Sequence, residues 1–360
     1  MAGTSGSPPA LFFFKRTTTL WPSPNRPTGH CPKGRAVQPA RQGPIAQPQG
    51  KVSPVEFFQH ILNALQFGSF YALIALGYTL VYGVLRLINF AHGDIFMVGA
   101  YIAYFVAVLL LGGEGMHGLG LSPALTLAIT VPVTMILTSL VGVTLERTMY
   151  RPLRRKGADR LYVVITALMA GLMLENGNLA LLGASRKSFP ELMEKVVWTF
   201  GGVSVTNLKV VVIVAAIVVF VLLEFIVTKT KIGMAMRGIS YDKFAIPLMG
   251  IPLDTIIVVT FILGSSMAGL AGILYAMSYP ILEPYMGALI GWKAFIAAVV
   301  GGIGDIRGAI VGGFLLGFIE IGVVAVFPST LRDLFAFSVL LGILWLKPTG
   351  LFGVAQTTKI

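Results

Sequence analysis

The chain has 360 residues, of which 56% are hydrophobic and only 12% are charged, and its mean hydropathy is +0.83. Soluble domains carry about a quarter charged residues, so this composition excludes a water-exposed globular fold and indicates a polytopic helical membrane protein. The net charge is +12, but the basic residues lie between apolar segments, which favours a role in membrane topology over nucleic-acid binding.

Residues 1–52 form an arm that is basic and rich in Pro, Gly, Ser and Thr. The arm has too few apolar residues to offset the entropy of ordering, so we expect it to be disordered. It holds Cys31, the single cysteine of the chain, which excludes an intramolecular disulfide framework and a cysteine-based metal site. No Met lies between Met1 and Met97, and we hypothesise that translation starts near Val52, so that the mature protein lacks the arm.

The membrane domain is expected over residues 53–353, followed by a short cytoplasmic tail at residues 354–360. Its apolar runs have about the 17–25 residues that cross a hydrocarbon core of about 30 Å. The seventh run is short, contains Lys293 and ends in glycines, which is typical of a half-helix or re-entrant element. The sequence therefore predicts an all-α membrane helix bundle with about eight or nine spans. The spans lie at approximately 59–82, 93–111, 122–146, 161–183, 208–227, 254–278, 288–304, 309–327 and 333–346.

Small residues recur at every fourth position in the later spans, and this spacing predicts faces where helix backbones approach closely. We expect these faces to serve helix packing, which requires no transport function. They are formed by Gly264, Ala268 and Gly272, by Gly308 and Gly312, and by Ala309, Gly313 and Gly317.

Basic residues concentrate in the loop after the third span, from Glu146 to Arg160, and in the loop after the fifth span, which begins near Lys229. Loops rich in Lys and Arg stay in the cytoplasm, so we expect both loops to lie there. The same alternation places the basic arm outside, which the rule disfavours. Either the mature protein lacks the arm, which we favour, or an extra crossing lies near residues 83–95.

Several polar residues interrupt or adjoin the apolar spans, where a buried charge costs about 3 kcal/mol. They are candidates for a translocation pathway, and for the residues around a broken helix a purely structural role is the open alternative. His92 and Asp94 could also form a general base and its orienting carboxylate. However, no recognisable nucleophile or His-Glu-x-x-His helix occurs, so we expect no enzyme and no metal site. The pathway candidates are Asn89, His92, Asp94, Glu175, Asn176 and Lys293.

The loop at residues 228–255 is too long for a tight connector and too apolar to be simply solvated. In a helical reading, Phe244, Leu248 and Ile251 share one stripe. Such a helix could lie on the membrane surface or insert into the groove of a soluble partner, and both interpretations stay open. No Gly-x-x-x-x-Gly-Lys-Ser/Thr motif occurs, so in an ATP-driven system another chain would bind the ATP.

Ordered motifs over roughly residues 55–353 make the sequence resemble the LivH-type permeases of branched-chain amino acid ABC transporters. The longest is GYTLVYGVLRLINFAHGD at residues 77–94. The others are ERTMYRPLR at 146–154, MAMR at 234–237, LMGI at 248–251, GWKAF at 291–295 and GGIGDIRGA at 301–309.

This resemblance implies that the 228–255 loop is the coupling segment that docks on an ATP-binding subunit, with Gly250 at the glycine of the family's coupling motif. The sequence departs from the importer signature Glu-Ala-Ala, because Phe244 precedes Ala245 and the nearby acid is Asp242. Trp292 and Arg307 also replace the aliphatic residue and the proline that the family pattern leads us to expect. The implied coupling residues are Arg237, Asp242, Lys243, Ala245, Gly250 and Ile251.

The resemblance also implies the partners and the location of the protein. A second homologous permease subunit would complete the pore, and two cytoplasmic subunits would bind ATP, with no cofactor on this chain. An extracytoplasmic solute-binding protein would deliver the amino acid across a bacterial or archaeal cytoplasmic membrane. These parts would work by alternating access, in which ATP closure biases a two-state element.

Three other functions remain to be weighed against a branched-chain amino acid importer. A same-family importer of urea or another small amide differs only in the solute, which a binding assay on the solute-binding protein would identify. An ion-coupled secondary transporter or channel would use Asp94, Glu175 and Glu320 as coupling carboxylates, but the coupling-segment resemblance counts against it. A structural membrane scaffold is disfavoured by the polar residues inside the spans.

Overall fold

The computed structural model describes residues 54–112, 119–242 and 245–353. The arm at residues 1–52, for which we expect disorder, and the short tail at 354–360 lie outside the described residues. Of the residues named in the sequence analysis, Lys243 and Phe244 also lie outside them.

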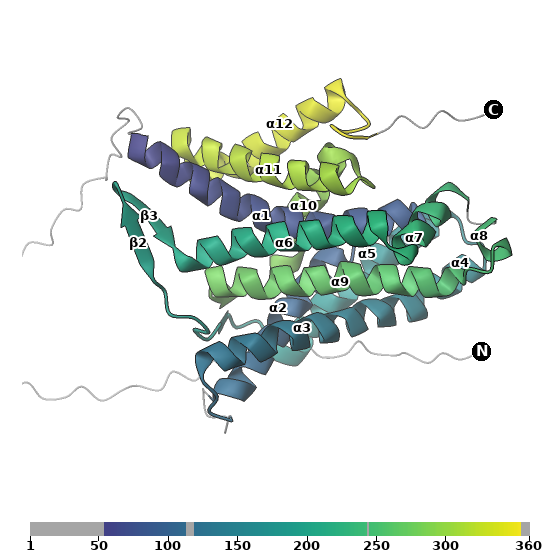
Figure 1. The fold of residues 1–360 in the computed structure, drawn as a ribbon, viewed down its shortest axis with the longest axis horizontal. Coiled ribbons are helices and arrows are strands. Elements are labelled where there is room, and N and C mark those ends of the chain that lie inside the picture. The colour runs from purple at the N-terminus through teal and green to yellow at the C-terminus, as the bar shows by residue number, and fades with distance from the viewer. Residues whose placement is uncertain (1–53, 113–118, 243–244, 354–360) are drawn as a thin grey trace, which may run out of the picture. The chain divides into compact units, whose positions relative to one another are not determined.

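The described residues are mainly α-helical, and eight segments are long and apolar enough to cross a membrane. The helix α10 is apolar but has only 17 residues, which agrees with the short seventh span expected from the sequence. The prediction of an all-α membrane bundle with eight or nine spans is therefore confirmed (Figure 1). The helices are α1 (Pro54–Leu85), α2 (His92–Leu111), α3 (Pro123–Leu145), the π-helical turn η1 (Glu146–Tyr150), α4 (Arg151–Arg155), α5 (Arg160–Leu182), α6 (Asn207–Lys229), α7 (Lys231–Tyr241), α8 (Ala245–Leu248), α9 (Leu253–Ser278), α10 (Met286–Gly302), α11 (Ile306–Val326), the 3-10 turn η2 (Ser329–Leu331) and α12 (Arg332–Leu346).

Two ends of the helix bundle are distinguished by their short elements (Figure 1). At one end β2 (Val197–Phe200) and β3 (Val203–Thr206) form an antiparallel hairpin, and we call this the hairpin end. The strands β1 (Lys187–Ser188) and β4 (Ile281–Leu282) also pair there and join the α5–α6 and α9–α10 connections. At the opposite end α4, α7 and α8 lie together, and we call this the tip end.

Close backbone packing between helices depends on the small residues that the sequence analysis singled out. A Cβ atom added at Gly317 in α11 would lie 2.5 Å from the backbone nitrogen of Gly68 in α1. One added at Gly272 in α9 would lie 2.8 Å from the backbone nitrogen of Ala100 in α2. No side chain larger than hydrogen fits at these distances, so these glycines serve helix packing as expected.

The expectation of one helix that carries both Leu248 and Ile251 is wrong, although Ala245–Leu248 is helical. The helix α8 ends at Leu248, and Gly250 turns the chain with a φ of 79° that L-residues rarely adopt. Ile251 precedes Pro252, which disfavours helical backbone at Ile251. The amphipathic helix of this loop is instead α7, whose buried face consists of Gly233, Ala235, Met236 and Ile239.

Candidate functional site

The segment from α7 to Ile251 ends the bundle in an exposed apolar surface, which we call the tip. Tyr241 at the end of α7 is 90% exposed, Leu248 at the end of α8 is 88% exposed, and Met249 directly after it is 74% exposed. Exposed apolar side chains that gather at one end of a protein mark a contact with another molecule or with a membrane. The exposed tip is therefore compatible with both interpretations from the sequence, a contact with the membrane surface and a contact with a soluble partner.

Local contacts hold α7 against the end of α6, so the tip has a defined position. The hydroxyl of Thr230 caps α7 by accepting a hydrogen bond from the Gly233 backbone nitrogen at 3.1 Å. A Cβ at Gly233 would overlap the carbonyl oxygens of Ile226 and Val227, so only glycine fits at this turn. The guanidinium of Arg237 donates a hydrogen bond to the Val227 carbonyl, which ties α7 back to α6.

The other predicted coupling residues lie along the tip. Asp242 follows the last residue of α7, and its backbone nitrogen donates to the Gly238 carbonyl at 3.1 Å. Ala245 begins α8, and Ile251 is half-buried beyond the turn. A Cβ at Gly250 would have no atom within 4 Å, so the space around this residue is open. A partner surface could approach the backbone there.

The pathway candidate Asp94 lies in the first turn of α2 between the backbones of two other helices. A Cβ at Gly287 in α10 would lie 2.9 Å from Asp94 Oδ1, and one at Gly171 in α5 would overlap Oδ2. The side chain of Asp94 is buried, and its Oδ1 has no hydrogen-bond partner among the described residues. Glu175, one turn beyond Gly171 on α5, interacts electrostatically with Asp94. The structure thus places two of the predicted carboxylates together.

The next two candidates lie at the break between α1 and α2, Asn89 within it and His92 as the first residue of α2. The ring of His92 packs edge-on against Tyr78 at 4.8 Å between ring centroids, and a Cβ at Gly77 would overlap the imidazole. Among the described residues, His92 Nε2 has no hydrogen-bond partner. Asn89 Oδ1 accepts a hydrogen bond from the Tyr150 hydroxyl at 2.7 Å, which connects the break to η1.

Asn176 and Lys293 lie apart from this group. Asn176 is exposed on α5, and its amide donates to the Leu172 carbonyl at 2.8 Å. Lys293 in α10 forms ion pairs with Glu320 in α11 at 2.9 Å and with Asp333 in α12 at 2.7 Å. The structure therefore separates the candidates into a carboxylate pair with the helix break, an exposed amide and a buried ion-pair cluster.

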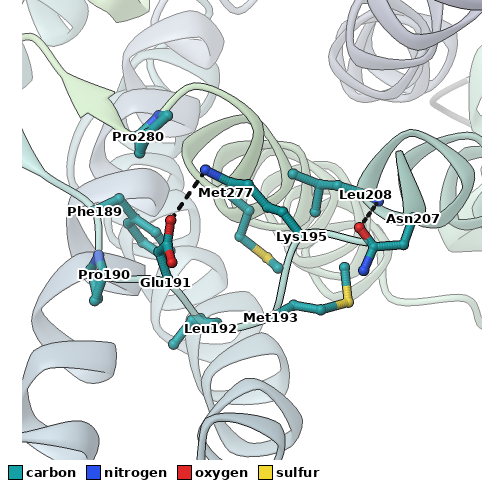
Figure 2. A pocket seen from close by; sticks show the side chains of 10 residues that line it. All are labelled: Phe189, Pro190, Glu191, Leu192, Met193, Lys195, Asn207, Leu208, Met277 and Pro280. Carbon is teal, nitrogen blue, oxygen red and sulfur yellow. Dashed lines mark hydrogen bonds and ion pairs between the residues drawn. The ribbon is translucent and has the colours of Figure 1, made fainter. Parts of the chain in front are cut away.

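A small hollow at the hairpin end, open to solvent, lies between the α5–α6 connection and the ends of α6 and α9 (Figure 2). Met193, Leu208 and Met277 give it apolar walls, and Glu191 and Lys195 form an ion pair of 3.3 Å at its rim. The described residues contain no group of three or more His, Cys, Asp or Glu side chains that could hold a metal ion.

One cluster near the tip was not anticipated from the sequence. Asp254, in the first turn of α9, forms ion pairs with Arg151 and Arg154 at 2.6 Å and with Arg155 at 3.1 Å. The sequence signal was available, because an acid follows the apolar loop and a basic run follows the third span. The pairing itself spans about a hundred residues and cannot be inferred from local pattern.

Comparisons with known proteins agree on one family. A family model described as "Branched-chain amino acid transport system / permease component" matches residues 60–344. The high-affinity branched-chain amino acid transport system permease protein BraD of Pseudomonas aeruginosa is 38% identical over 309 residues, which cover 84% of this chain and 98% of BraD. LivH of Escherichia coli, with the same description, is 34% identical over the same shares. A probable LivH of Methanocaldococcus jannaschii is 29% identical over 72% of this chain and 78% of its own length.

Proposed function

Because the chain belongs to the family of permease components of branched-chain amino acid transport systems, we propose that it is the membrane subunit of an ATP-driven importer of branched-chain amino acids. The observation that carries the proposal is the tip, where Tyr241, Leu248 and Met249 expose apolar side chains at one end of the bundle. A membrane subunit that is driven by ATP hydrolysis on another chain needs a surface on which that chain can dock.

The tip end faces the cytoplasm in this proposal. Exposed basic side chains surround it, and basic residues close to membrane spans mark the cytoplasmic side. These side chains favour a soluble cytoplasmic partner, and we assign the tip to docking on two ATP-binding subunits. The coupling contacts would come from Arg237, Asp242, Lys243, Ala245, Gly250 and Ile251. The exposed basic residues include Arg147, Arg155, Lys156, Arg160, Lys229 and Lys231.

The translocation pathway would run past the break between α1 and α2. Asp94 supports this assignment because its Oδ1 is buried without a hydrogen-bond partner among the described residues, next to Glu175. Unpaired polar atoms at membrane depth are costly and typically belong to functional sites. Asn89 and His92 would line the same passage. Asn176 would face it from the exposed side of α5, and Lys293 would act on it through its charge.

The remaining partners follow from the exposed surfaces. Large apolar side chains are exposed along α5 and α6, and a second homologous permease would cover part of this area while lipid covers the rest. A solute-binding protein would dock at the hairpin end, on the extracytoplasmic side of a bacterial or archaeal cytoplasmic membrane. We propose this arrangement for the whole transporter, with no catalytic residue on the permease itself.

Affinity purification of the tagged full-length chain from its native membranes tests the assembly. We expect a second permease and ATP-binding subunits to co-purify in mild detergent. The purified complex, placed in liposomes with Mg-ATP inside and the solute-binding protein outside, should then accumulate labelled leucine.

Ionophores that collapse proton and sodium gradients serve as the control for ion coupling. Uptake that persists with ionophores and stops without ATP supports the proposal. Uptake that requires an ion gradient and no ATP would replace it with a secondary transporter, and uptake of urea in place of leucine would correct the substrate.

A further inference from the structure

Three arginines of α4 converge on one carboxylate beside the tip. Asp254 Oδ2 accepts hydrogen bonds from Arg151 at 2.6 and 3.0 Å and from Arg155 at 3.1 Å, while Oδ1 accepts one from Arg154 at 2.6 Å. Asp254 lies three residues after Ile251, where the tip joins α9. Asp254 and the arginines bound to it therefore lie at the junction of the tip and α9.

Arg154 also contacts a second acid, Glu146, which is buried. Its Nη2 also lies 3.1 Å from Glu146 Oε1, and the Glu146 side chain is completely buried. Among the described residues, Arg154 is the only cation paired with Glu146. A buried carboxylate that loses its cation is strongly destabilised, so Glu146 and Arg154 are expected to move together.

The π-helical turn η1 extends the connection to the helix break. Glu146 begins η1 and Tyr150 ends it, and the Tyr150 hydroxyl donates to Asn89 Oδ1 at 2.7 Å. Asn89 follows Arg86, whose φ of 56° marks the end of α1. Single π-helical turns inside helices occur frequently at functional sites.

A small pocket borders these residues. It is lined by Asn89, Tyr150 and Arg154 together with apolar residues of α1, α5 and α9. The Nδ2 of Asn89 and the Oε2 of Glu146 have no hydrogen-bond partner among the described residues. Unused hydrogen-bonding capacity beside a cavity permits alternative pairings without a large packing penalty.

We propose that Asp254, Arg154, Glu146 and Tyr150 form a transmission clamp that carries displacement of the tip to the break between α1 and α2. The four residues are positioning residues, since they contact neither ATP nor the transported solute. The inference rests on the proposed role of the tip in docking ATP-binding subunits. Coupling between distant sites needs an element with two arrangements that both sites influence, and η1 has that role in the proposed clamp.

Arg151 and Arg154 provide a matched pair of variants. Arg151→Gln and Arg154→Gln each remove one cation from Asp254, but only the second also removes the link to Glu146. Tyr150→Phe removes only the hydroxyl and keeps the ring that packs against Phe261 at 5.4 Å between centroids. If these residues only anchored α4 to α9, the two arginine variants would have similar effects on the uptake per ATP hydrolysed. Tyr150→Phe would then have almost no effect.

The test uses the complete transporter in proteoliposomes and measures leucine uptake and ATP hydrolysis in the same preparation. We expect Arg154→Gln and Tyr150→Phe to lower the uptake per ATP hydrolysed about fivefold to tenfold, within the usual range of coupling between sites. Arg151→Gln should stay near the wild-type ratio. Asp254→Asn should also lower the ratio, and Asp254→Glu should restore part of it.

The clamp is refuted if uptake and hydrolysis fall together, or if the ratio is unchanged in both Arg154→Gln and Tyr150→Phe. If Arg154→Gln fails to assemble with its partners, the ratio measured for Tyr150→Phe decides alone. Failure of the proposed function is a separate result, because the wild-type complex would then show no ATP-dependent uptake.

Discussion

The Nζ atom of Lys293 in α10 lies 2.9 Å from Oε1 of Glu320 in α11, at a site where the Glu320 side chain is only 1% exposed. The Tyr71 hydroxyl of α1 donates to the other oxygen of Glu320 at 2.9 Å, and Asp333 of α12 lies 2.7 Å from Lys293. These contacts join α1 to α10, α11 and α12, which lie more than 200 residues later in the chain. The cluster is therefore expected to stabilise the packing of α12 on the bundle.

Removing the cation of this cluster should destabilise the protein strongly. Lys293→Met removes the nearer cation of the buried Glu320 and leaves only Arg332 at 3.9 Å, which should cost up to about 3–5 kcal/mol. Thermal unfolding in detergent, followed by the loss of the monodisperse peak, measures the effect. Arg332→Gln is the control, because its ion pair with Glu320 is long at 3.9 Å and the Arg332 side chain is 36% exposed. We expect it to cost less than about 1 kcal/mol.

The double variant Lys293→Met with Glu320→Gln separates charge from packing. It removes both charges and keeps an acceptor for Tyr71, so most of the lost stability should return. A double variant as unstable as Lys293→Met would show that the lysine side chain contributes by packing instead of by neutralising Glu320.

Asp94→Asn tests the proposed pathway. The substitution keeps the side-chain volume between the backbones of Gly171 and Gly287, so assembly should be unchanged. Loss of the negative charge next to Glu175 should alter the uptake rate, by about tenfold for a change of ~1.4 kcal/mol in the barrier. Asp159→Asn is the matched control on an exposed carboxylate that makes no capping hydrogen bond. Reduced amounts of folded complex with normal uptake per complex would assign Asp94 a structural role.

The positions of the spans could be predicted from the sequence because apolar runs of membrane length leave few alternatives. The predicted span at 254–278 differs from α9 by one residue, and the short seventh span corresponds to α10. The glycine faces could also be predicted from the sequence, since residues spaced by four lie on one side of a helix.

The partners of the polar residues could not be predicted in this way. Tyr71 and Glu320 are separated by 249 positions, and no local pattern indicates which acid a buried lysine meets. The tip was also misread, because periodicity places Leu248 and Ile251 on one helical stripe while Gly250 turns the chain between them. The preference of Gly250 and of the nearby proline for a turn outweighs the helical spacing of the apolar residues. The Gly-Ile-Pro sequence is the signal that indicates this turn.

Substitution of Gly250 tests docking at the tip. Gly250→Arg adds bulk and charge where the backbone is open, so ATP-driven uptake should fall at least about tenfold, equivalent to ~1.4 kcal/mol of docking free energy. The φ of 79° adds backbone strain to any L-residue, and Gly250→Ala shares that strain without the bulk. Gly250→Asn should be tolerated best, since Asn adopts this conformation more readily. Equal loss in all three variants would assign the effect to the turn and not to docking.

Two glycines of α11 provide the sharpest test of helix packing. A Cβ at Gly317 would lie 2.5 Å from the Gly68 nitrogen and 2.7 Å from the Ala64 carbonyl oxygen, both backbone atoms of α1 that cannot rotate away. Gly317→Ala should therefore force α1 and α11 apart and cost about 1–3 kcal/mol or more. At Gly322, five residues further along the same helix, a Cβ meets nothing within 4 Å.

Gly322→Ala is accordingly expected to leave the protein unchanged or to stabilise it by about 0.5–1 kcal/mol, the helix-propensity gain of alanine over glycine. Thermal unfolding of both variants in the same detergent gives the comparison, with uptake measured in parallel. Opposite shifts would establish that α1 and α11 pack through bare backbone in the membrane. A stable Gly317→Ala variant would mean that the two helices lie farther apart than the structure places them.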